Sequence, residues 1–299
     1  MILATAAYLV WGVFPLYFPL LFPADATEIL AHRILWCAAT AALLLLVPRL
    51  RASISVLIRS RRRVLILTAG AVFLAANWFT YVWAVNHGEV VQASLGYYAN
   101  PLVSVLLGVV VLSERLRRLQ WVAIGIATLA VVWLTFEYGR VPWVSLVLAV
   151  SFALYGLLKK QADAPAVQSM VVEAGVLAPA ALLYVVAIQV AGSGTFTDHG
   201  PAHALLLISA GPVTIVPLLL FAGAATRVPL SVIGLLQYLT PTMQLLLGVL
   251  VQHEPLPPGR FAGFCGVWLA LVVLGFDSVR AGRLRRRALL TPTVTSSAG

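Results

Sequence analysis

The chain has 299 residues, of which 61% are hydrophobic and only 10% charged, and its mean hydropathy is +0.98. A soluble domain carries about a quarter charged residues, so this composition excludes a water-soluble globule. The formal net charge is +10, but the basic residues flank apolar segments, which is typical of membrane topology and argues against nucleic-acid binding.

Ten apolar segments are long enough to cross a bilayer. A spanning helix needs about 20 residues for roughly 30 Å of hydrocarbon, and lipid cannot satisfy the backbone of an open sheet. In chain order the segments are 3–21, 28–47, 64–86, 90–112, 119–136, 142–158, 169–191, 203–224, 231–251 and 260–277. We therefore predict an all-α polytopic membrane protein with ten transmembrane helices. The first segment has no basic region before it, so we interpret it as a retained helix rather than a signal peptide.

The second and third segments carry polar residues inside apolar sequence. Glu28 and His32 are four residues apart, and Arg33 follows them. Because helical side chains tilt towards the N-terminus, Arg33 can reach the outer surface. One interpretation is an outer-surface ion cluster, and the other is a part for Glu28 in proton coupling. In the third segment Asn77 and Tyr81 share a face, and both are candidate substrate contacts.

The fourth and ninth segments each place polar residues and a proline on one helix face. Intramembrane polar side chains normally face the bundle interior. They could line a substrate cavity, or they could be hydrogen-bonding links of about 0.6–2 kcal/mol between helices. A proline frees a backbone carbonyl that a cavity or neighbour must satisfy, which favours the cavity. The candidates are Tyr97, Asn100, Pro101 and Ser104 in one segment, and Gln237, Tyr238, Thr240, Pro241 and Gln244 in the other.

Glu173 lies near the start of the seventh segment, 169–191. A carboxylate at the centre of a membrane helix costs about 2.5–3.5 kcal/mol, and less near an end. Glu173 could carry a coupled proton, or it could stabilise the positive end of its own helix dipole. Both interpretations stay open from the sequence.

The basic residues define an orientation for ten spans. With the N-terminus inside, the segments 48–63, 113–118, 159–168, 225–230 and 278–299 are cytoplasmic and hold 17 of the 20 Lys and Arg residues. The outer side keeps Arg33, Arg140 and Arg260. The positive-inside rule therefore predicts that both termini are cytoplasmic.

An internal repeat relates the two halves of the chain. Residues 95–114 and 235–254 are identical at nine of 20 positions without a gap. We expect Glu114 and Glu254, which end the two stretches, to pair with an arginine in their loops. Five helices is an odd number, so the second copy starts from the opposite side of the membrane, as in many secondary transporters. The expected units are repeats 1–140 and 141–277, followed by a basic tail, 278–299.

Several stretches resemble the RarD branch of the EamA-type drug/metabolite transporters. They include AYLVWGVFPLYFPLL at 7–21, EILAHRILW at 28–36, ANWFTYVWAVNHG at 76–88, SLGYYANPLVSVLLG at 94–108 and GLLQYLTPT at 234–242. The resemblance covers nearly the whole chain and implies a ten-helix, two-repeat transporter of the bacterial inner membrane. The branch is associated by name with chloramphenicol sensitivity, which does not establish a substrate.

The sequence predicts a secondary transporter of small metabolites or drugs, working by alternating access and in the export direction. It contains no G-x-x-x-x-G-K-[ST] motif for ATP and no catalytic signature, so we expect neither an enzyme nor a cofactor or metal. A channel, a sensor or a lipid-handling enzyme is the alternative. The expected partners are a small-molecule substrate and the lipid bilayer, with a homodimer left open.

Overall fold

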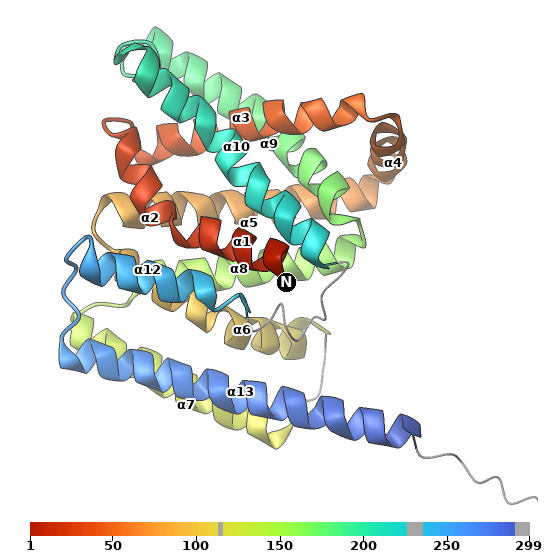
Figure 1. Cartoon of the computed structure of the whole chain (residues 1–299), viewed down its shortest axis with the longest axis vertical. Helices are drawn as coiled ribbons and strands as arrows, with labels where there is room; N and C mark the ends of the chain where they lie inside the picture. Colours follow the sequence, from red (N-terminus) through yellow and green to blue (C-terminus); the bar gives the residue numbers. More distant parts are fainter. Residues whose placement is uncertain (113–115, 226–235, 291–299) are drawn as a thin grey trace, which may run out of the picture. The chain divides into compact units, whose positions relative to one another are not determined.

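The computed structural model describes residues 1–112, 116–225 and 236–290, and all regular structure in those ranges is helical (Figure 1). Within those ranges eight helices are long and apolar enough to cross a membrane, and a ninth candidate is the first segment, which bends by 40° after Gly12. The all-helical, multi-pass prediction is confirmed. The apolar helix in the predicted ninth segment, Leu239–Leu250, is shorter than a full span, and residues 231–235 lie outside the described ranges.

The chain divides into two compact units. The first unit comprises Met1–Ser104 and Pro142–Leu256. It contains α1 (Ile2–Gly12), α2 (Phe14–Tyr17), η1 (Phe18–Leu21), α3 (Ala26–Leu43), η2 (Leu44–Leu46), α4 (Pro48–Ile58), α5 (Arg61–Asn86), the start of α6 (Val90–Leu112), α8 (Trp143–Ala162), α9 (Ala166–Val190), α10 (Gly200–Ala225) and α12 (Leu239–Leu250). The second unit comprises Val105–Val141 and Pro257–Gly299, with the rest of α6, α7 (Arg118–Tyr138) and α13 (Pro258–Leu290).

Local sequence explains where several helices begin and end. The side chain of Asp25 accepts a hydrogen bond from the Glu28 backbone N–H at 2.7 Å, which caps the start of α3. Ser60 caps α5 in the same way. Helix α7 ends at Gly139, whose φ of +63° suits a residue without a Cβ. These capping residues therefore fix where α3 and α5 begin and where α7 ends.

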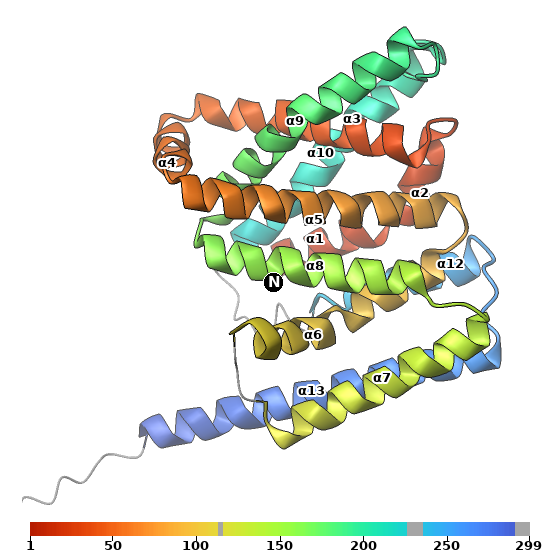
Figure 2. The ribbon, with the colours of Figure 1, turned by 180° about the vertical axis from the view of Figure 1, so that it is seen from behind.

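Close helix packing forms the core of the first unit. Helix α3 packs against α9 and α10, and α5 packs against α8 (Figure 2). Gly211 in α10 allows the closest approach, because a Cβ added there would lie 2.3 Å from the carbonyl carbon of Trp36 in α3. Leu148, Leu207 and Val82 are fully buried between these helices. The contact of α3 with α10 is therefore backbone against backbone.

In the second unit, α7 and α13 lie side by side along their length (Figures 1 and 2). Their ends are fixed by polar contacts. The Arg117 side chain donates to Asp277 at 2.6 Å, and Trp133 Nε1 donates to the Gly259 carbonyl at 2.8 Å. Helix α13 continues beyond the predicted span end at 277 as far as Leu290.

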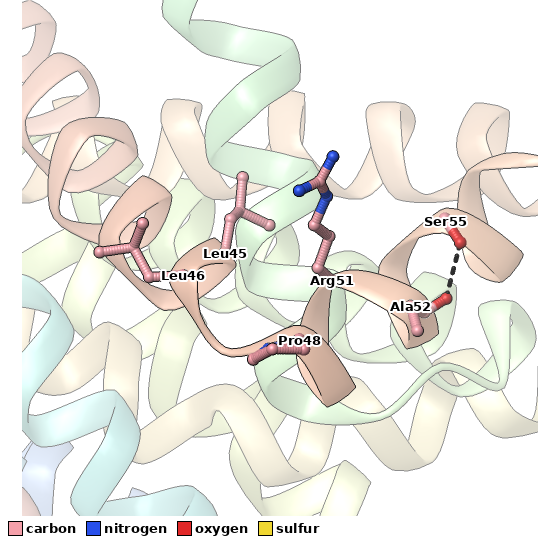
Figure 3. Close-up of a pocket in the computed structure, with 6 residues that line it drawn as sticks. All are labelled: Leu45, Leu46, Pro48, Arg51, Ala52 and Ser55. Carbon is pink, nitrogen blue, oxygen red and sulfur yellow. Dashed lines mark hydrogen bonds between the residues drawn. The ribbon is translucent and has the colours of Figure 1, made fainter.

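The basic segment that we expected to be a loop, 48–63, instead contains helix α4. Its apolar residues Ile54 and Leu57 are buried in a cluster with Val171 and Val172 of α9. A surface pocket lies where η2 meets α4 (Figure 3), and Ser55 there donates to the Ala52 carbonyl at 2.7 Å. The residues that line it are Leu45, Leu46, Pro48, Arg51, Ala52 and Ser55. None of them belongs to the predicted substrate pathway.

Candidate functional site

Asn77 links three helices of the first unit. Its Nδ2 donates to the Leu148 carbonyl at 3.0 Å and to Ser151 Oγ at 3.1 Å, both in α8. Its Oδ1 accepts from the Tyr97 hydroxyl of α6 at 3.2 Å. Tyr97 also contacts Tyr81, with ring centroids 5.7 Å apart. Three predicted pathway residues, Asn77, Tyr81 and Tyr97, therefore lie together, although protein groups satisfy the hydrogen bonds of Asn77.

Helices α6 and α12, which come from equivalent parts of the repeat, contact each other. Tyr98 and Tyr238, which occupy equivalent repeat positions, stack with ring centroids 6.4 Å apart and planes at 18°. The Tyr98 hydroxyl is 2.7 Å from Thr242 Oγ1. Further along, a Cβ added at Gly248 would lie 3.2 Å from Val91 Cγ2. The residue numbers rise along one helix as they fall along the other, so these helices run antiparallel here.

The other predicted pathway residues are spread over several neighbours. Asn100 and Ser104 bond to each other at 3.0 Å, and Ser104 is exposed. Thr240 donates to the Tyr8 carbonyl at 2.8 Å. Gln244 is buried and its Nε2 donates to the Trp11 carbonyl at 3.4 Å. Gln237 is half-buried. Thr240 and Gln244 thus face α1, and the structure does not bring them into contact with Asn77.

The two prolines occupy different helix positions. Pro101 is inside α6, where it removes one backbone hydrogen bond. Pro241 is the third residue of α12 and follows a turn at Gln237 and Tyr238. A proline is well tolerated in the first turn of a helix, where its missing N–H would have no intrahelical acceptor.

Glu173 forms a buried ion pair with Lys159. The Lys159 Nζ is 2.6 Å from Glu173 Oε1 and also donates to Ser169 Oγ at 2.5 Å. The Tyr155 hydroxyl donates to Glu173 Oε2 at 3.1 Å. Because α9 begins at Ala166, Glu173 lies beyond the first turn, and its carboxylate bonds to these side chains rather than to the start of the helix.

Glu28 lies in a second buried polar cluster. Its Oε1 accepts from the Thr195 backbone N–H at 2.7 Å, and it lies 3.9 Å from His32 Nε2. The Thr195 hydroxyl is 2.8 Å from His203 Nε2. The ring of His32 stacks on Phe196 with centroids 4.8 Å apart. The predicted proximity of Glu28 and His32 is confirmed, and both side chains are buried in the protein.

Arg33 does not reach outwards as we expected, because only 3% of it is exposed. Its Nε donates to Thr214 Oγ1 of α10 at 2.8 Å. Its Cζ lies 4.1 Å from the ring centroid of Trp78 and 5.4 Å and 5.5 Å from those of Phe14 and Phe18. The direction in which a side chain leaves a helix depends on its neighbours, and here aromatic rings stabilise an inward guanidinium.

The expected pairing of Glu254 with an arginine is also wrong. Its two carboxylate oxygens accept from the backbone N–H groups of Val90 and Val91, at 2.6 and 2.7 Å. Glu254 therefore caps the start of α6 from a distant part of the chain. Burial raises the pKa of this carboxyl above its usual value, and the two backbone bonds oppose that rise. Glu114, its repeat equivalent, lies outside the described residues.

Sequence reasoning did not anticipate Lys159 or Thr214 as partners of intramembrane charges. The positive-inside rule treats Lys159 only as a cytoplasmic basic residue. Lys159 lies in the last turn of α8, and its spacing of four residues from Tyr155 can be read from the sequence. Among the described residues no cluster of three or more His, Cys, Asp or Glu residues could hold a metal ion. Apolar spanning helices that enclose buried charged and polar clusters define a multi-pass membrane protein.

Comparisons with known proteins specify the family. The EamA-like transporter family matches residues 1–136. The chain is 50% identical over 293 residues to Protein RarD of Streptomyces exfoliatus, covering 97% of this chain and 93% of the relative. It is 43% identical over 282 residues to an uncharacterized transporter of Pseudomonas aeruginosa, covering 94% and 95%. The chain belongs to the EamA-like transporter family, in its RarD-like branch, and is a membrane transporter.

A solved crystal structure shows the same fold. It is 22% identical in sequence, superposes with a TM-score of 0.57, and matches over 95% of this chain and 97% of that chain. At this level of identity the similarity concerns the arrangement of helices only.

Proposed function

We propose that this chain is a secondary transporter that exports small molecules by alternating access. The two moving parts are inverted five-helix repeats, 1–140 and 141–277, with a basic tail, 278–299. Since the sequence has no ATP-binding motif, transport uses the gradient of the solute or of a coupled ion. The family relationship supports the transporter class, and the internal repeat supports the mechanism.

The observation that carries this proposal is the contact between Tyr98 and Tyr238. The two residues are equivalent in the repeat, and their rings stack at 6.4 Å. A two-fold axis brings a residue next to its own equivalent only where the axis passes between them. An axis in the membrane plane also reverses helix direction, as the antiparallel α6 and α12 require. The contact between equivalent residues is what inverted repeats would produce.

The proposed substrate pathway follows from this axis. It comprises the polar faces of α5, α6 and α12 and is lined by Asn77, Tyr81, Tyr97, Asn100, Ser104, Gln237, Tyr238, Thr240 and Gln244. The bonds of Asn77 to α8 and of Thr240 to α1 hold these helices together in the conformation described. Alternating access would require some of these bonds to exchange, with Pro101 and Pro241 providing breaks in backbone bonding.

We further propose Glu173 as the coupled-proton carrier, with Glu28 as a second candidate. Both are buried carboxyl groups, with 4% and 3% of the residue exposed. Each has a basic neighbour, Lys159 for Glu173 and His32 for Glu28. A membrane carboxyl group with a nearby partner that can release or accept charge is a common proton-relay arrangement.

The proposed orientation places both termini on the cytoplasmic side of the bacterial inner membrane. The segment around α4 would then carry its arginines at the anionic inner leaflet. Reporter fusions at Ser55 and at Gly299 should score as cytoplasmic, and one at Gly194 as periplasmic. A periplasmic score at either basic segment would refute the orientation.

Transport can be tested with the purified protein. A thermal-shift screen against amino acids, nucleosides and amphenicols should identify a ligand, because a compound that binds the folded state raises its melting temperature. The same compound should then undergo counterflow in proteoliposomes without ATP. A ligand that binds tightly but is never exchanged across the membrane would refute the transport proposal.

Cysteine accessibility tests the pathway residues. The background is Cys37→Ala with Cys265→Ala, and a water-soluble thiol reagent should label pathway positions, with protection by substrate. Lipid-facing controls are Leu106 and Leu246, which are 40% and 51% exposed in the bare protein and should stay unreactive in lipid. If the control positions react with the reagent and the pathway positions do not, the polar residues serve helix packing rather than substrate binding. The pathway variants are Tyr97→Cys, Ser104→Cys, Gln237→Cys and Gln244→Cys.

A further inference from the structure

Arg33 carries a buried positive charge that no carboxylate of the described residues neutralises. Ion pairs among the described residues join His32 to Glu28, Arg63 to Asp163, Arg117 to Asp277 and Lys159 to Glu173, and Arg33 belongs to none of these four. Glu28, in the same helix α3, accepts from Thr195, and Glu173 of the adjoining helix α9 pairs with Lys159, so both buried carboxylates have other partners. A buried charge without a counter-ion is strongly unfavourable.

Among the described residues the Arg33 Nε has a hydrogen-bond acceptor, but Nη1 has none. Nε donates to Thr214 Oγ1 at 2.8 Å, and the Thr214 hydroxyl in turn donates to the Ala210 carbonyl at 2.8 Å. Nη1 is buried and has no hydrogen-bond partner among the described residues. Arginine has five N–H donors and no acceptor, so the groups on Nη1 require an acceptor from outside the helices described.

A second buried donor without a partner lies in the same neighbourhood. The Tyr81 hydroxyl is buried and has no hydrogen-bond partner in the described ranges. Its ring contacts Phe18 with centroids 5.9 Å apart, and Phe18 also lies beside Arg33, 5.5 Å from Cζ. Tyr81 is within electrostatic reach of Arg33. Two unsatisfied donors, one of them charged, thus lie beside the same aromatic ring, that of Phe18.

We infer that Arg33 and Tyr81 form a binding site for the carboxylate group of the transported molecule. A carboxylate is acceptor-only and matches the planar donors of a guanidinium, and a tyrosine hydroxyl can donate to it as well. One cation with one neutral donor fits a single negative charge rather than a phosphate dianion. The rings of Phe14, Phe18 and Trp78 would then contact an apolar or aromatic remainder of the molecule.

This site deepens the proposed transport function and depends on it. Arg33 comes from α3 in the first half of the chain, and Thr214 comes from α10 in the second half, so the guanidinium joins elements of both proposed repeats. Binding of a carboxylate at Nη1 would neutralise a charge held at this junction. The charge at this junction therefore differs between the occupied and the empty state. Such a difference would let the ligand favour one conformation of the two repeats over the other.

The experiment compares carboxylates with their uncharged primary amides. The probes are benzoate, 3-phenylpropionate and L-phenylalanine, each beside its amide, and the readout is thermal stabilisation of the wild-type protein followed by titration of Kd. At least one carboxylate should stabilise the protein more than its amide does. Tyr81→Phe should weaken the binding of that carboxylate by about tenfold, and Arg33→Gln should weaken it by about 10- to 100-fold. These factors correspond to the range for hydrogen bonds to charged groups.

Tyr17→Phe is the matched control. Tyr17 is also within electrostatic reach of Arg33, but its hydroxyl donates to the Leu206 carbonyl at 2.9 Å, so its loss should leave carboxylate affinity unchanged. Tyr81→Phe removes one oxygen atom only and keeps the test available if Arg33→Gln does not fold. The inference is overturned if no carboxylate is preferred over its amide, or if Tyr81→Phe and Arg33→Gln retain the preference.

The two proposals fail in different ways. Equal counterflow of a carboxylate and its amide would leave the transport function intact and remove the carboxylate site. Selective binding of a carboxylate that depends on Arg33, without any counterflow, would support the site and refute transport. A purely structural Arg33, held by its aromatic neighbours, would lower the melting temperature of Arg33→Gln without changing the preference for carboxylate.

Discussion

The buried pair of Lys159 and Glu173 should behave as one energetic unit. The two charged atoms are 2.6 Å apart, and the side chains are 23% and 5% exposed. We predict that Lys159→Met and Glu173→Gln each destabilise the protein, whereas the double variant recovers most of the loss. The physical reason is that either single change leaves a charge that the low-dielectric interior does not solvate.

The magnitude follows from the burial of each partner. Breaking a buried pair costs about 3–5 kcal/mol. Lys159→Met leaves an almost fully buried carboxylate with Tyr155 as its remaining side-chain donor, so we expect about 3 kcal/mol. Glu173→Gln leaves Lys159, which is partly exposed and can turn towards water, so about 2 kcal/mol is expected. The double variant should lose about 1 kcal/mol, because replacing both charges is often nearly neutral.

The assay is equilibrium unfolding of the four proteins in one detergent, followed by tryptophan fluorescence as SDS is added. Lys160→Met is the control, since it removes the same charge at an exposed neighbouring position. A double variant whose loss equals the sum of the two single losses would show no coupling. That result would refute the pair as a stabilising unit.

The same variants test proton coupling separately from stability. If Glu173 carries the transported proton, Glu173→Gln should abolish uptake driven by a pH gradient and leave equilibrium exchange of substrate intact. The stable double variant should also lose pH-driven uptake, which separates coupling from folding. Normal pH-driven uptake by Glu173→Gln would exclude this residue from coupling.

Two further predictions concern Glu254 and Gly211. Because burial raises the folded-state pKa of Glu254, the folded protein binds this proton more tightly than the unfolded chain does. The free energy of unfolding should therefore fall as pH rises from the usual glutamate value, about 4.3, through the raised folded value. Glu254→Gln should flatten this part of the pH curve, and parallel curves would contradict the reasoning. Gly211→Ala should cost about 1–3 kcal/mol through overpacking, because its Cβ would meet the Trp36 backbone at 2.3 Å. Gly156→Ala, with no atom within 4 Å of the added Cβ, should be tolerated in the same unfolding assay.

The positions of the spanning helices could be predicted from sequence because hydrocarbon imposes length and apolarity on every crossing segment. Helices α5, α6 and α10 contain or closely match the predicted segments 64–86, 90–112 and 203–224. Helix α4 could not be predicted because arginines at 49 and 51 and serines at 53 and 55 interrupt its apolar residues, and burial of Ile54 and Leu57 against α9 creates its apolar face.

The partners of the intramembrane charges could not be predicted in the same way. Segment charge and spacing indicate that a polar group is present, but not which way it faces. Arg33 and Thr214 are 181 residues apart, and Glu254 and Val90 are 164 apart, so both contacts depend on how distant helices pack. Glu173 could be recognised as unusual from sequence, whereas its pairing with Lys159 depends on the turn between α8 and α9.

The stacked pair of Tyr98 and Tyr238 has an evolutionary consequence if the repeats descend from one duplicated five-helix ancestor. In a dimer of that ancestor, each tyrosine would have touched its own copy, so one mutation would have altered both sides of the contact at once. After fusion into a single chain the two copies could change independently. The neighbouring pair, Tyr97 and Gln237, has diverged. The position that contacts its own equivalent, Tyr98 with Tyr238, still carries the same residue in both halves, as expected of a former homodimer interface.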